Sequence, residues 1–142
     1  MSSENIEIVL ATLQNMNESI NRLIDWNKDV TCADEWPRSS MGMQLLSADC
    51  MLLQAIGEAV KQIEKRAGVD FLNQCSDIPW QEIKSMRNHI AHGYFEIDVD
   101  YVFSTIKTDL VPLQHAVTTL INVLTKTKKQ FLLTQMFNNL KS

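Results

Sequence analysis

The stretch "SMGMQLLSADCMLLQAIGEAVKQIEKR", residues 40–66, decides the fold, because its apolar residues recur at the three- and four-residue steps of a helix. Gly57 sits inside this stretch, where glycine costs roughly 1 kcal/mol relative to alanine, so we expect a neighbouring helix to approach closely there. Gly68 follows in the position that a left-handed helix C-cap prefers. The face expected to be buried comprises Met41, Leu45, Ala48, Leu52, Ala55, Ile56, Ala59, Val60 and Ile63.

The residues on the N-terminal side of this stretch predict another helix and a connection. Apolar residues recur at helical spacing over residues 4–29, and Ser3 precedes them as a candidate N-cap. Residues 31–40 form the connection, because Pro37 disfavours a helical conformation at Trp36.

The residues that follow predict a loop and a third helix. Residues 69–79 form the loop, and Pro79 occupies the first position of a helix that we expect Gly93 to end. The core face of this helix is predicted to comprise Ile83, Met86 and Ile90.

A fourth helix is expected to begin at Asp98 or Asp100, either of which can cap it, and to continue to about residue 124. Pro112 should bend it. Residues 125–142 carry three lysines and then an apolar segment, which we expect to dock on the bundle or on a second copy. The lysines are Lys126, Lys128 and Lys129, and a solvated helix face is their simplest interpretation.

The composition favours a single helical domain. The chain has 142 residues and is 45% hydrophobic, which is enough for a single core. Only 4 glycines and 3 prolines are present, so few turns are available for short strands. We therefore predict one all-α domain over residues 1–142, folded as a four- to five-helix up-and-down bundle.

The charge and the cysteines restrict the function. A net charge of −4 argues against a general nucleic-acid-binding surface, so any RNA contact should be local. The three cysteines, Cys32, Cys50 and Cys75, lack metal-ligand spacing and are odd in number, which predicts reduced thiols in a cytoplasmic protein without a metal cofactor. The first 20 residues lack a basic region and no long apolar run occurs, so neither a signal peptide nor a membrane contact is expected.

The candidate functional residues lie in "RNHIAHGYF", residues 87–95. A histidine such as His92 titrates near neutrality and can move a proton, and Arg87 stays charged and fits phosphate oxygens. Together they could cleave RNA without a metal ion. From these residues alone, a simpler interpretation stays open: basic side chains suit the C-terminal end of a helix, and Gly93 caps it.

Three stretches together resemble the HEPN family, and within it the HepT-like ribonuclease toxins of MNT/HEPN toxin–antitoxin pairs. They are "AIGEAVKQI" (55–63), "DIPWQEIKSMRNHIAHGYFEID" (77–98) and "VFSTIKTDLVPL" (102–113). They occur in the family's order and cover roughly residues 53–115. The Ile-Pro-Trp, Met-Arg-Asn and His-Gly-Tyr-Phe groups carry most of the specificity.

The resemblance implies a HEPN homodimer in which two Arg-x4-His motifs meet in a cleft at the interface. It also implies metal-independent cleavage of RNA, not DNA, that leaves a 2′,3′-cyclic phosphate. By the motif, Arg87 and His92 are the catalytic pair and Asn88 supports them. Tyr94 corresponds to the tyrosine that an MNT-type nucleotidyltransferase antitoxin modifies with AMP in type VII-like pairs.

Two alternatives remain from the sequence. One is a non-catalytic HEPN module that docks a nucleotidyltransferase or holds a nucleotide; the other is a structural bundle whose motif is only helix-end chemistry. His89 receives no role, and His115 is interpreted as a structural or surface residue. Trp80 and Tyr101 are expected to pack the starts of the third and fourth helices.

Overall fold

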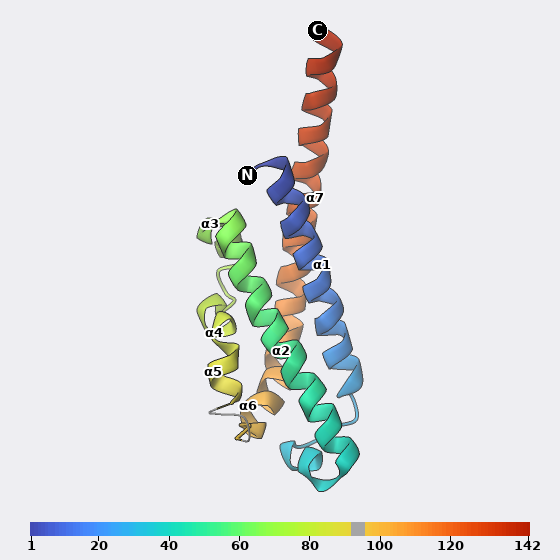
Figure 1. The fold of residues 1–142 in the computed structure, drawn as a ribbon, viewed down its shortest axis with the longest axis vertical. Coiled ribbons are helices and arrows are strands. Elements are labelled where there is room, and N and C mark those ends of the chain that lie inside the picture. Colours follow the sequence, from blue (N-terminus) through green and yellow to red (C-terminus); the bar gives the residue numbers. More distant parts are fainter. Residues whose placement is uncertain (92–95) are drawn as a thin grey trace.

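The computed structural model describes residues 1–91 and 96–142, and these form an all-α, up-and-down bundle (Figure 1). The chain descends through α1, returns through α2, descends through α4 and α5, and returns through α6 and α7. The predicted all-α class is therefore confirmed, although the described chain has seven α-helices where four or five were expected. The bounds are α1 (Ser3–Trp26), α2 (Ser40–Ala67), α3 (Val69–Leu72), α4 (Trp80–Lys84), α5 (Met86–Ile90), α6 (Val99–Ser104) and α7 (Leu110–Lys141).

The entry into α1 and the connection to α2 differ from the prediction. Ser2, not Ser3, is the N-cap of α1, and its hydroxyl accepts a hydrogen bond from the Asn5 N–H at 3.1 Å. The connection contains a 3₁₀ helix, η1 (Ala33–Arg38), which includes Trp36. Trp36 is buried and its ring meets Phe103 edge-on at 6.2 Å between centroids. Burial of the indole outweighs the local preference imposed by the following proline.

The face that α2 buries is rotated from the predicted one along its N-terminal half. Met41 is 79% exposed, and Ala55 is also exposed. The prediction was wrong there because α2 has two stripes of apolar residues. The stripe that is buried contains an aspartate, which made it look like the solvent-facing one. Asp49 is fully buried, where its carboxylate accepts a hydrogen bond from the Asn27 amide at 2.8 Å. The buried residues are Leu46, Asp49, Cys50, Leu53, Ile56, Gly57, Val60 and Ile63.

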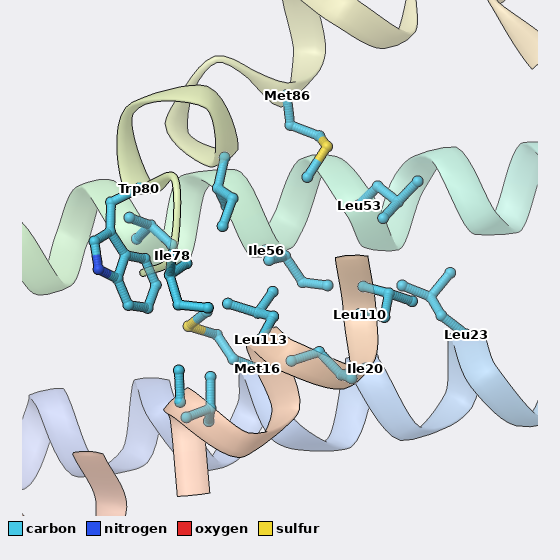
Figure 2. Close-up of a cluster of buried hydrophobic side chains, with 14 of the residues drawn as sticks. Met16, Ile20, Leu23, Leu53, Ile56, Ile78, Trp80, Met86, Leu110 and Leu113 are labelled. Carbon is cyan, nitrogen blue, oxygen red and sulfur yellow. The ribbon is translucent and has the colours of Figure 1, made fainter. Parts of the chain in front are cut away.

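The core joins α1, α2 and α7 to the shorter helices (Figure 2). Trp80 covers one end of this cluster, and its indole N–H donates to the Cys75 carbonyl at 3.0 Å. The packing role expected for Trp80 is therefore confirmed, and α4 and α5 are fastened to the long helices. The labelled core side chains are Met16, Ile20, Leu23, Leu53, Ile56, Ile78, Trp80, Met86, Leu110 and Leu113.

Gly57 allows α4 and α5 to lie against α2, as predicted. A Cβ atom at this position would stand 2.7 Å from the Ile83 carbonyl oxygen and 3.4 Å from the Met86 Cβ. No side chain larger than hydrogen fits there without movement of the α4–α5 backbone. Gly68 ends α2 with a φ of 89°, which confirms its predicted role as a left-handed C-cap residue.

The predicted third helix is two short helices. Ser85 separates α4 from α5, with its N–H shared between the Gln81 and Glu82 carbonyls. α5 ends at Ile90, not at Gly93, because Ala91 is extended and pairs with Ile97 in an isolated antiparallel bridge. His92 and Gly93 lie outside the described residues.

The last part of the chain is helical from Val99 to Lys141, with one π-helical turn, η3 (Thr105–Asp109). The Asp98 carboxylate caps α6 by accepting from the Tyr101 N–H at 3.0 Å, as predicted. The π-helical turn ends three residues before Pro112, where a bend was predicted, and α7 continues through the proline.

α7 continues past the predicted end near residue 124 and projects beyond the bundle (Figure 1). Its final apolar side chains are 48–83% exposed, so of the two docking partners expected for this segment its own bundle is excluded, and docking on a second copy stays a prediction. They are Leu132, Leu133, Met136, Phe137 and Leu140. Among the helices of the described chain, none has both the length and the hydropathy needed to cross a membrane.

Candidate functional site

Arg87 and Asn88 are presented by α5, which is anchored by its two apolar residues. Met86 and Ile90 are buried one turn apart, so the residues between them must point outward. Arg87 and Asn88 are accordingly exposed. α5 has only 5 residues, but its backbone is held against α2 because Ile90 is fully buried and Gly57 allows a close approach. The positions from which Arg87 and Asn88 extend are therefore well defined.

A hollow of about 300 Å³ lies between α2 and α5, at the base of Arg87. One wall comes from α2, and the other from α5 and the Ala91–Ile97 bridge. Arg87 and Asn88, both predicted from the sequence, are thus placed on one hollow together with residues far away in sequence. The lining residues are Cys50, Gln54, Arg87, Asn88, Ile90, Ala91 and Ile97.

The charge in this hollow favours an anion. Arg87 is its one ionisable cation among the described lining residues, and no carboxylate of the described chain lines it. Within residues 1–91 and 96–142, no ion pair or hydrogen bond engages the Arg87 guanidinium. A guanidinium without a carboxylate partner can bind phosphate oxygens in a bidentate manner.

A second hollow, of about 170 Å³, has the opposite character. Its lining includes Asp77, Glu82 and Asp109. Burial, followed by the charge of Glu82, raises the pKa of the Asp109 carboxyl. The carboxylates there would repel a polyanion, so this hollow is a poorer candidate for binding phosphate than the one lined by Arg87.

Cys50 and Gln54 contribute to the first hollow and were not predicted. They are one turn apart on α2, and only the rotated packing of α2 turns them toward α5. Burial, with a smaller contribution from Asp49, raises the pKa of the Cys50 thiol to about 11. The thiol is therefore protonated at neutral pH and is a poor nucleophile.

The remaining candidate residues are not brought to this hollow by the described structure. His89 stacks on Tyr101 with 5.3 Å between ring centroids, which is the packing expected for that tyrosine and gives His89 a structural role. His115 is exposed on α7 and lines a different depression. His92 and Tyr94 lie outside the described residues. Within those described, no group of three His, Cys, Asp or Glu side chains could hold a metal ion.

Comparison with known proteins gives consistent results. A family model described as "Ribonuclease HepT-like" matches residues 16–120, which include α2, α5 and the hollow between them. "Putative RNase MJ1380" of Methanocaldococcus jannaschii is 30% identical over 109 residues, covering 77% of this chain and 93% of that protein. "Probable ribonuclease HepT" of Thermococcus cleftensis is 28% identical over 102 residues, covering 72% and 86%. No solved structure matches the chain significantly.

Proposed function

The chain belongs to the HepT-like ribonuclease family, and from this premise we propose that it is a metal-independent endoribonuclease whose reaction is carried out by His92 and Arg87. We propose further that it is the toxin of a type VII-like toxin–antitoxin pair. The observation that supports the site is the position of Arg87: its guanidinium borders a hollow that contains no described carboxylate, on a helix within the family match.

The proposed reaction is transesterification of the RNA backbone. His92 accepts the proton of a 2′-hydroxyl or protonates the leaving oxygen, since an imidazole can do either near neutral pH. The 2′-oxygen bonds to phosphorus and the P–O5′ bond breaks, leaving a 2′,3′-cyclic phosphate and a 5′-hydroxyl. Arg87 stabilises the negative charge that builds on the phosphate oxygens, and Asn88 holds the strand beside it.

The test is cleavage of a mixed tRNA and messenger RNA substrate in EDTA by purified protein without any antitoxin. We expect product ends that mass spectrometry identifies as 2′,3′-cyclic phosphates, and loss of cleavage in His92→Ala and Arg87→Ala. His115→Ala is the matched control, because His115 is an exposed histidine on α7. Equal cleavage by the wild type and His92→Ala would refute the mechanism.

We propose that the active form is a homodimer assembled through α2. The stripe that α2 leaves uncovered supports this, since Met41 and Met51 are largely exposed and Met51 is one turn before Gln54. Met51→Glu should therefore yield monomers in light scattering and abolish cleavage. Val111→Glu, at an exposed apolar residue near the start of α7, should change neither. A fully active Met51→Glu monomer would contradict the shared cleft.

We propose that an MNT-type nucleotidyltransferase antitoxin silences the protein by attaching AMP to Tyr94. The added phosphate would repel RNA and compete for Arg87. Co-expression with an MNT-type nucleotidyltransferase should raise the mass of the wild type by whole AMP units. The chain has only 2 tyrosines, so Tyr101→Phe is the natural control and should still be modified, whereas Tyr94→Phe should not. Modification of Tyr94→Phe would disprove the assignment.

A further inference from the structure

The hollow beside Arg87 is lined by side chains that phosphate binding alone does not require. Binding phosphate needs cations and N–H donors, yet this hollow also has an apolar lining and two carboxamides. We propose that it is a nucleobase-binding pocket that takes the base next to the scissile phosphate, and that Gln54 and Asn88 select adenine. The proposal rests on the proposed ribonuclease function, and it adds a substrate preference to it.

The size and the apolar lining of the hollow suit a planar aromatic ring system. An apolar cavity of about 150 Å³ holds benzene, and this hollow is about 300 Å³, enough for the two fused rings of a purine. Its apolar lining comes from Ala91 and Ile97, which are half-buried, and from the fully buried Ile90 behind the surface, with the protonated Cys50 thiol on the α2 side. These groups can cover the face of a base that has left its stack, which is how single-stranded RNA is commonly read.

The edge of such a base would meet Gln54 and Asn88. Each carboxamide presents an N–H donor and a C=O acceptor side by side. Neither side chain forms a hydrogen bond with another residue in the ranges 1–91 and 96–142. We infer that the amides read the Hoogsteen edge of the base: there a paired donor and acceptor matches the N7 acceptor and N6 donor of adenine, guanine presents two acceptors, and pyrimidines lack N7.

The two amides come from different helices, α2 and α5, which pack against each other. Gln54 extends from the middle of α2, whose neighbour Leu53 is fully buried, and Asn88 extends from α5. Gly57 fixes the approach of these two helices. Because rigid elements hold both groups, the pocket can discriminate between bases rather than merely tolerate them. Arg87, at the same opening, is in place to bind the adjoining phosphate.

The test uses short single-stranded RNAs that are identical except for the base on either side of one cleavable phosphate. We expect the wild type to cleave the adenine substrate about tenfold more efficiently than the others, judged by kcat/KM. Gln54→Met, which keeps the length and removes the amide, should bring the four substrates within about twofold of one another. Gln62→Met, an exposed glutamine two turns further along α2, should retain the wild-type preference.

The outcomes separate this proposal from the one on which it rests. Cleavage without base preference, or a preference that Gln54→Met leaves intact, overturns the adenine pocket while the ribonuclease stands. Absence of all cleavage refutes the ribonuclease instead. The pocket is then decided by calorimetric titration with the four nucleoside 5′-monophosphates: tighter binding of AMP that Gln54→Met abolishes supports it, and equal binding of all four overturns it.

Discussion

Replacement of Asp49 by asparagine should stabilise the protein at neutral pH and leave it unchanged in acid. Asp49 is fully buried on α2, and one carboxylate oxygen accepts a hydrogen bond from the Asn27 amide. The other oxygen, and the Asn27 side-chain oxygen, have no partner among the described residues. An ionised carboxylate is therefore only half satisfied, whereas asparagine has nearly the same shape, carries no charge and brings an N–H donor.

The magnitude follows from the pKa of Asp49. Burial raises this pKa from 3.8 to about 6, against the opposing effect of the Asn27 hydrogen bond. Between these values the native state binds the proton more tightly than the unfolded state, so stability falls as the pH rises from about 4 to about 6. Well above pH 6 the ionised carboxylate destabilises the native state to its full extent. A shift of roughly two pKa units corresponds to about 3 kcal/mol, which Asp49→Asn should recover in large part.

The assay is urea unfolding of both proteins between pH 4 and pH 8. The difference in unfolding free energy should be near zero at pH 4 and grow to about 2–3 kcal/mol at pH 7 and above. Asp25→Asn is the control, because Asp25 is on the surface of α1 with its side chain 72% exposed and should give a small difference. A constant gap between wild type and Asp49→Asn across this range would refute the reasoning.

Three further perturbations test the packing and the helix ends. Gly57→Ala should lower the unfolding free energy by about 1–3 kcal/mol, because the new Cβ would meet the Ile83 carbonyl oxygen at 2.7 Å. This clash should outweigh the higher helical preference of alanine. Unchanged urea unfolding would contradict this prediction. Removal of residues 132–142 should shift Tm in calorimetry by less than about 2 °C, since their apolar side chains are exposed. Asp98→Ala should cost about 1 kcal/mol in urea unfolding through loss of the α6 cap, and Asp100→Ala much less.

Local patterns predicted the helices well. Apolar spacing identified α1 and α2 nearly to their ends, and the roles of Gly57 and Gly68 followed from the properties of glycine alone. The rotation of α2 could not be predicted, since both of its stripes are apolar and the buried one depends on Asn27 as a distant partner for Asp49. A hydrogen bond between residues far apart in the sequence cannot be predicted from the spacing of apolar residues.

The candidate site was predicted in part. Arg87 was predicted because a guanidinium suits phosphate chemistry, and Asn88 because of the resemblance to the HEPN motif; both line a hollow, and their roles stay predictions. Gln54 was not predicted, because it is more than thirty positions earlier in the chain and only the packing of α2 on α5 brings it near. The early end of α5 was also not predicted, because it depends on the pairing of Ala91 with Ile97.

The π-helical turn η3 makes the length of the chain between α6 and α7 critical. The turn has 5 residues, and deletion of one of them would let it relax to an ordinary α-helix. Every side chain of α6 would then swing by about 100° relative to α7. Tyr101 would leave His89 and Met86, its present neighbours. Libraries of insertions and deletions should therefore tolerate changes at the free end of α7 and reject a one-residue deletion here.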